Sequence, residues 1–308
     1  MMQKIIPHLW FDNEAEEAAD FYVSIFNNSR KMEVEYHNKA SAEVSGKSEG
    51  SVLGVEYEIE NFRFYNINGG SFFKINPVIS FFVKCQSEAE IDSLWNKLAE
   101  GGKALMPLDK YPFNDKYGWV EDKFGVSWQL MLCSDCKQKI VPSLMFVGEE
   151  SGKAEEAINY YTSVFKDSKI DEISRYGQGM EPNKSEDLNY AAFTLAGQEF
   201  AAMDSALDHQ FKFNEGVSLL ISTGSQEETD YYWNKLSAVP ESGQCGWLKD
   251  KFGVFWQVVP EVLNKYLRDP DSEKSGRVMK AFLKMKKINI AELESAYEGK
   301  NISHSASK

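Results

Sequence analysis

Histidine, cysteine and basic residues are scarce in this sequence. The 308 residues include 4 His and 4 Cys, and 34 Lys and Arg stand against 47 Asp and Glu, giving a formal net charge of −13. So few cysteines exclude a disulfide-based scaffold and suit a reducing compartment. An average field of this sign repels nucleic acid, and no basic stripe offsets it. The pair Cys133 and Cys136, alone in a polar linker, is expected to be two free thiols.

Long apolar runs are also missing. No stretch approaches the roughly 20 apolar residues that a membrane-spanning helix needs, and no apolar segment followed by a cleavage site stands near residue 1. We therefore expect a cytoplasmic protein with neither membrane nor nucleic-acid partners. The content of 43% hydrophobic and 26% charged residues is typical of globular proteins, and this length suffices for two domains.

The sequence does contain an internal repeat. Its clearest matches are AEEA at residues 15–18 and 154–157, WNKL at 95–98 and 233–236, and DKFGV at 122–126 and 250–254. The offset between the copies falls from 139 to 138 and then to 128, so the second copy has lost a net ten residues before its DKFGV segment. Collinear matches of this kind indicate duplication. We expect domains at residues 1–135 and 138–262, followed by a helical extension at 263–308.

Each copy is expected to contain two βαβββ units. In the first copy, β-rich or alternating runs predict strands at residues 4–11, 52–60, 62–67 and 78–83. Apolar residues spaced three and four apart predict a helix at about 14–26, and Ser87 begins a second helix. The extension is expected to form two short helices whose apolar faces pack on the second domain.

Several segments resemble PhnB-like proteins. They are HLWFDNEAEEAADFYVSIF (8–26), GWLKDKFGVFWQVVPEVL (246–263) and RVMKAFLKMKKINIAELESA (277–296). These proteins are often labelled 3-demethylubiquinone-9 3-methyltransferase-like and are a branch of the vicinal-oxygen-chelate superfamily, which includes glyoxalase and bleomycin-resistance proteins. The resemblance implies an α+β fold of two tandem glyoxalase-like domains, each of two βαβββ units, with a short helical C-terminal tail.

The resemblance also implies four positions for divalent-metal ligands, on the first, middle and last strands of a domain. In this sequence they fall on Pro7, Pro142, Val78, Gly216, Gln129, Gln257 and the carboxylate of Glu56. His8, as the neighbour of Pro7, is expected to face the helices. Each domain then keeps at most two ligands and no histidine, so we expect no intact metal site and no cofactor. The alternative is a Zn, Ni, Fe or Mn site that uses Glu56 and Gln129.

The concave sheets are expected to form cups for a small organic ligand. The residues expected to face them are Leu9, Phe11, Glu56, Asn66, Ser127, Gln129, Phe146, Asp204, Phe255 and Gln257. Such a mixture of apolar and few polar groups suits a small-molecule site, although the same side chains could simply fill the sheets. No catalytic residue is identified.

Three functions remain open at this stage. The first is a binding protein for a small, partly apolar molecule. The second is a divalent-metal-dependent lyase, isomerase or dioxygenase. The third is a methyltransferase, for which we find no glycine-rich cofactor turn. Fusion of two domains supplies an internal partner, so we expect a pseudo-dimeric monomer, with a homodimer as the alternative.

Overall fold

The computed structural model describes residues 3–300, and these contain four related units. The first comprises β1 (Ile5–Phe11), α1 (Ala15–Ile25), β2 (Arg30–Tyr36), α2 (Lys39–Ser45), β3 (Val52–Ile59) and β4 (Phe62–Asn68). The second comprises β5 (Ile79–Cys85), α3 (Glu88–Ala99), β6 (Lys103–Tyr111), β7 (Asn114–Glu121) and β8 (Ser127–Leu132). Strands β2 and β6 and helix α2 had not been located from the sequence.

The second copy repeats this order. Its third unit comprises β9 (Ile140–Val147), α4 (Ala154–Val164), β10 (Lys169–Arg175), β11 (Leu188–Leu195) and β12 (Gln198–Ser205). The fourth comprises β13 (Val217–Thr223), α5 (Gln226–Leu236), β14 (Trp247–Lys249) and β15 (Phe255–Pro260). The ten-residue loss replaces the long β6–β7 hairpin by a 3-10 turn at Pro240–Ser242 and the short strand β14. The α+β fold expected from the sequence is confirmed, with one strand fewer in the last unit.

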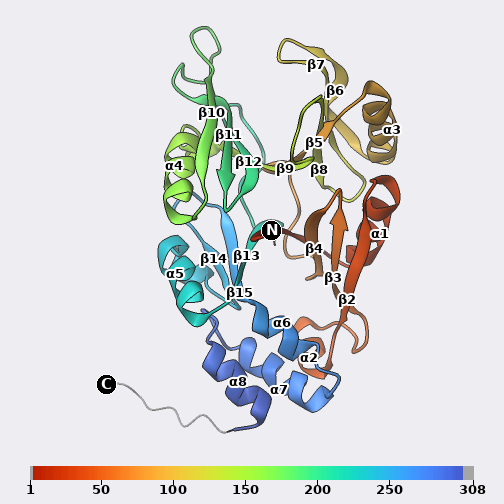
Figure 1. The fold of residues 1–308 in the computed structure, drawn as a ribbon, viewed down its shortest axis with the longest axis vertical. Helices are drawn as coiled ribbons and strands as arrows, with labels where there is room; N and C mark the ends of the chain where they lie inside the picture. The colour runs from red at the N-terminus through yellow and green to blue at the C-terminus, as the bar shows by residue number, and fades with distance from the viewer. Residues whose placement is uncertain (1–2, 301–308) are drawn as a thin grey trace.

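Each of the two sheets combines one unit from each copy (Figure 1). The seven-stranded sheet A has the order β14-β15-β13-β1-β4-β3-β2, and the eight-stranded sheet B has the order β10-β11-β12-β9-β5-β8-β7-β6. The copies join through the antiparallel pairs β1–β13 and β5–β9. In Figure 1 the first copy, red to yellow, lies on the right and the second, green to blue, on the left. The duplicated halves are thus paired as two subunits would be.

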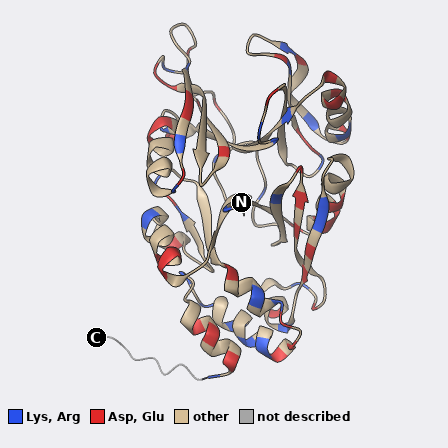
Figure 2. Ribbon diagram, viewed as in Figure 1, with Lys and Arg blue, Asp and Glu red and all other residues tan. Residues whose placement is uncertain are grey.

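The helices cover the outer faces of the sheets and bury a continuous apolar core. Helix α1 contributes Ala15, Ala18, Ala19 and Tyr22 to this core, as its helical spacing predicts. Figure 2 shows acidic and basic residues interspersed over these outer helices. Among the helices of residues 3–300, none combines the length and the apolar character that crossing a bilayer requires.

A buried aspartate anchors each DKFGV turn. The Asp122 carboxylate accepts hydrogen bonds from the Tyr22 hydroxyl and Trp128 Nε1, both at 2.8 Å, and from two backbone amides of its own turn. Asp250 makes the same contacts with Tyr161 and Trp256. Burial raises the pKa of both carboxyls to about 6. Because this turn bonds to the first helix of the same copy, it ties the two units of that copy together.

The linker between the copies differs from its prediction in one respect. Cys133 and Cys136 form a disulfide, whereas free thiols were expected.

The C-terminal extension forms α6 (Glu261–Leu267), α7 (Ser272–Phe282) and α8 (Ile290–Glu298). It packs on the second copy, as expected, through a separate apolar cluster that includes Val259, Leu263, Val278 and Leu293. Helix α7 also contacts α2 of the first copy. The extension therefore bridges both copies below sheet A (Figure 1).

Candidate functional site

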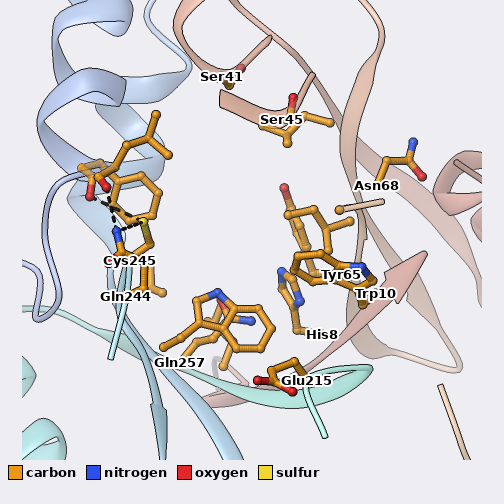
Figure 3. A pocket seen from close by; sticks show the side chains of 18 of the residues that line it. His8, Trp10, Ser41, Ser45, Tyr65, Asn68, Glu215, Gln244, Cys245 and Gln257 are labelled. Atoms are coloured by element: carbon orange, nitrogen blue, oxygen red, sulfur yellow. Dashed lines mark hydrogen bonds between the residues drawn. The ribbon is translucent and has the colours of Figure 1, made fainter. Parts of the chain in front are cut away.

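A cavity of about 500 Å³ lies between the concave face of sheet A and the C-terminal helices (Figure 3). Its walls come from β1 and β4 of the first copy, from β13, β14 and β15 of the second, and from α2, α6 and α7. Seven aromatic side chains line it: Trp10, Tyr65, Phe72, Phe73, Trp247, Phe255 and Phe282. Phe72 and Val44 line the cavity and are also solvent-exposed, so they mark its mouth.

The side chains of β1 that face the cavity are not the ones that the sequence predicted. Leu9 and Phe11 lie in the core under the helices, whereas His8 and Trp10 line the cavity. Alternation along the strand was correct, but the position expected to face the cup was wrong by one residue. The His8 ring stacks on Tyr65 with centroids 4.9 Å apart and meets Trp247 edge-on at 5.5 Å.

Three more residues expected in the cups lie on the helix side. Phe146 is part of the core. Asn66 donates through Nδ2 to the Ala15 carbonyl at 2.9 Å, and Asp204 accepts from the backbone amides of Gly152 and Ala154 at the start of α4. These two polar side chains satisfy backbone groups around helix starts, a role that explains polar residues in an otherwise apolar layer.

Phe255 and Gln257 do line the cavity. Gln257 donates through Nε2 to Ser218 Oγ at 3.0 Å, and its Oε1 makes no hydrogen bond within residues 3–300. Ser127 and Gln129 occupy the matching places on sheet B. There Gln129 donates to Ser80 at 2.7 Å and accepts from the Tyr117 hydroxyl at 2.5 Å, and Ser127 accepts from Trp119 Nε1 at 2.7 Å.

The two concave faces differ because sheet B is filled by its own side chains. Tyr117, Phe82, Val141 and Ala201 form a buried cluster there. At the positions matching Tyr117 and Phe82, the repeat places the smaller Cys245 and Leu220, and both line the cavity of sheet A. Sheet B keeps a more polar depression of about 600 Å³ near the linker, beside Lys84 and Glu199. Loss of bulk and of the long hairpin therefore leaves apolar space in only one of the two described sheets.

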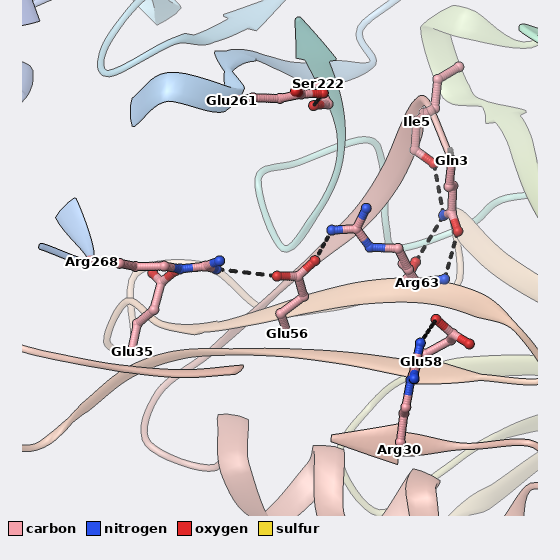
Figure 4. Close-up of polar contacts among 10 residues, drawn as sticks. All are labelled: Gln3, Ile5, Arg30, Glu35, Glu56, Glu58, Arg63, Ser222, Glu261 and Arg268. Atoms are coloured by element: carbon pink, nitrogen blue, oxygen red, sulfur yellow. Dashed lines mark hydrogen bonds and ion pairs between the residues drawn. The ribbon is translucent and has the colours of Figure 1, made fainter. Parts of the chain in front are cut away.

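Glu56 lies on the concave side of sheet A, but its carboxylate is occupied (Figure 4). It forms ion pairs with Arg63 and, at 3.2 Å, with Arg268 of the C-terminal extension. Arg268 also contacts Glu35 at 2.8 Å, and the Tyr65 hydroxyl donates to Glu35 at 2.7 Å. This network holds the extension against the sheet.

Burial keeps two ionisable side chains of the cavity, His8 and Cys245, in their neutral forms. Burial lowers the pKa of His8 to about 3, so the imidazole is uncharged at neutral pH. No hydrogen bond joins the His8 side chain to another residue among 3–300, and its Nδ1 is fully buried. Burial also raises the pKa of Cys245, which leaves a thiol rather than a nucleophilic thiolate.

The donor set of the cavity does not fit a catalytic divalent metal. Next to His8 stand Ser218 across the β1–β13 ladder and Tyr65 across β1–β4. Within residues 3–300, no three His, Cys, Asp or Glu side chains converge as metal ligands do. The alternative pair Glu56 and Gln129 was wrong, since these residues belong to separate sheets. The prediction that no histidine faces the cup was wrong as well.

Most of the cavity was missed from the sequence. His8, Trp10, Tyr65, Trp247 and Cys245 had not been assigned to a site, and neither had the extension that roofs it. One signal was available in the repeat itself, because bulky residues of the first copy align in sequence with smaller residues of the second. The roof gave no such signal, since it lies outside the repeat.

Comparisons with known proteins agree with this architecture. The model of the 3-demethylubiquinone-9 3-methyltransferase family matches residues 3–131 and again 138–259. The PhnB protein of Bacillus cereus is 38% identical over 42% of this chain and 100% of its own, with a TM-score of 0.39.

Two longer structures resemble nearly the whole chain at low identity. Glyoxalase I of Zea mays is 10% identical, covers 87% of this chain and 98% of its own, and has a TM-score of 0.54. A candidate dioxygenase of Bacillus subtilis is also 10% identical, covers 97% and 96%, and has a TM-score of 0.51. At this identity the likeness supports the fold alone. No curated protein matched the chain.

Proposed function

Since the chain belongs to the 3-demethylubiquinone-9 3-methyltransferase family, a PhnB-like branch of the vicinal-oxygen-chelate superfamily, we propose that it binds a small, largely apolar organic molecule in the cavity of sheet A, without a metal or other cofactor. The observation that carries this proposal is the aromatic cavity itself, formed by both copies and roofed by the extension. Its volume of about 500 Å³ is within the range of small-molecule sites.

The polar groups of the cavity favour binding over chemistry. Within residues 3–300 His8 makes no side-chain hydrogen bond, and Gln257 bonds the Ser218 hydroxyl, which contacts no acid–base group that could activate it. Convergent polar groups in an apolar cavity fix the orientation of a ligand. The methyltransferase name describes the family and adds no cofactor site, and the donor set does not support a metal-dependent reaction.

A neutral, environment-sensitive fluorophore such as N-phenyl-1-naphthylamine tests this proposal. We expect saturable binding at one site per chain. Leu220→Trp, which fills the cavity, should weaken binding at least tenfold because the ligand then collides with the indole. Phe82→Leu, at the matching position of sheet B, is the control and should leave the affinity unchanged. Equal affinity for wild type and Leu220→Trp, or no binding by either, would reject the cavity as the site.

Metal addition gives an independent check. A ligand that binds the folded state raises the melting temperature by mass action, so the fluorophore should raise it and Zn²⁺, Ni²⁺ or Mn²⁺ at equal concentration should not. A stoichiometric metal effect that disappears in His8→Ala would instead favour the metal-dependent alternative.

A further inference from the structure

The charges around the cavity define what ligand it selects. No Lys or Arg is among its described lining residues, whereas the carboxylates of Glu35 and Glu215 are. An anionic ligand buried here would have no charged partner, and leaving a charge unpaired in an apolar site is costly. The lining therefore disfavours acids.

The two carboxylates are not equivalent. Glu35 is compensated by Arg268, whose Nη2 and Nε lie 2.8 and 3.1 Å from it. Glu215 forms no ion pair and no side-chain hydrogen bond within residues 3–300, and it is half-buried. It leads into β13, where the carbonyl of the next residue, Gly216, accepts from the Trp10 amide at 2.9 Å. This bond holds the backbone next to Glu215 beside the aromatic wall of the cavity.

Two other polar side chains of that wall can each accept a hydrogen bond. Gln257 has a free Oε1, and neutral His8 retains one lone pair that makes no hydrogen bond within the described chain. Trp10 and Trp247 stand edge to face with centroids 6.1 Å apart, and the faces of indole rings attract cations. Figure 3 shows Glu215, His8 and Gln257 around the same end of the cavity.

We propose that the cavity selects organic amines, binding an aromatic or alicyclic body among its rings and the ammonium group at Glu215, His8 and Gln257. This inference rests on the proposed binding function and specifies its ligand class. The ammonium donates to the free acceptors and forms an ion pair with Glu215, while the apolar body replaces water against the aromatic walls.

Three ligands with one bicyclic skeleton test the charge preference: 2-naphthalenemethanamine, 2-naphthalenemethanol and 2-naphthoate. Displacement of the neutral fluorophore at pH 7.5 should rank the amine about tenfold tighter than the alcohol, and the carboxylate weakest. Glu215→Gln should remove the advantage of the amine and leave the affinity for the alcohol unchanged. Glu172→Gln, which removes an exposed carboxylate on β10, is the matched control for net charge and should change neither.

The outcomes separate this inference from the proposed function. Binding of the carboxylate as tight as that of the amine overturns the amine assignment, while the cavity stands as a binding site. An amine preference that survives Glu215→Gln overturns the role of Glu215. If the fluorophore binds but none of the three ligands displaces it, the amine assignment fails while the cavity stands. If the fluorophore does not bind, the proposed function fails first.

Discussion

His8 links the cavity to pH through its burial. Its pKa falls from 6.5 to about 3 on folding, so between these values the unfolded chain binds a proton that the folded chain does not. The contribution of His8 to the free energy of unfolding is therefore most favourable above pH 6.5, and it decreases as the pH falls toward 3. We expect about 2 kcal/mol less free energy of unfolding at pH 5 than at pH 7.5 from His8 alone.

The variant His8→Phe isolates this contribution, because it keeps a ring on Tyr65 and removes the titrating group. Urea unfolding at both pH values should show a smaller loss for the variant than for the wild type by about that amount. Parallel pH profiles for the two proteins would show that His8 is not the buried neutral base described here.

The aspartates of the two DKFGV turns have larger effects. Asp122→Ala leaves the Tyr22 hydroxyl, Trp128 Nε1 and two backbone amides without their acceptor in the core. We expect a loss of about 3–5 kcal/mol in the free energy of unfolding. Asp115→Ala removes an exposed carboxylate paired with exposed Lys110 and should lower the free energy of unfolding far less, because solvent screens this pair. Similar costs for the two variants would contradict the anchoring role of the turn.

How far residues could be placed from the sequence depends on their periodicity. Alternation along β1 divides it into two faces, but both faces are apolar enough to be buried, and the pattern alone does not tell which one contacts the helices. For this reason Leu9 was predicted to face the cup and His8 to face the helices, the reverse of what the structure shows. On β15 the assignment of Gln257 agreed with the structure, because Trp256 beside it is the large core residue.

At the scale of the element, the C-terminal extension is held on sheet A by Arg268. Arg268→Gln removes its ion pairs with Glu35 and Glu56, and leaves Glu35 as an uncompensated charge beside the cavity. We expect the neutral fluorophore to dissociate several-fold faster, since the roof opens more often, with a stability loss of about 1 kcal/mol. Stopped-flow dilution measures the rate.

The matched control is Arg175→Gln, which removes an exposed pair with Glu155 away from the cavity. It should leave the dissociation rate unchanged. An Arg268→Gln protein with a wild-type rate would show that the ion pairs do not govern the roof.

Individual helices and strands were easier to predict than the pairing of the strands. The repeat and the helical spacing located α1, α3 and most strands. Strand β2 is exposed and charged, with the sequence RKMEVEY, so hydrophobic alternation gave little sign of it. Which strands pair between the copies had no sequence signal, because β1, β5, β9 and β13 all carry similar apolar runs.

At the scale of the whole molecule, the two copies share sheets and core. Each sheet runs through a strand pair that joins the copies, and the main core includes Phe11 and Trp128 of the first copy and Phe146 and Trp256 of the second. Unfolding one copy alone would leave the central strands of the other with bare edges and exposed apolar faces. We therefore expect residues 1–262 to unfold as one cooperative unit.

The aspartate variants provide the test, because Asp122 and Asp250 are equivalent anchors in different copies. In a shared unit, Asp122→Ala and Asp250→Ala should each move the whole urea transition to lower concentration without splitting it, and circular dichroism and tryptophan fluorescence should coincide. With independent copies, each variant would lower only half of the transition and leave the other half in place. Two separated transitions in either variant would therefore contradict this expectation. They would show that the two copies unfold independently although they share sheets and core.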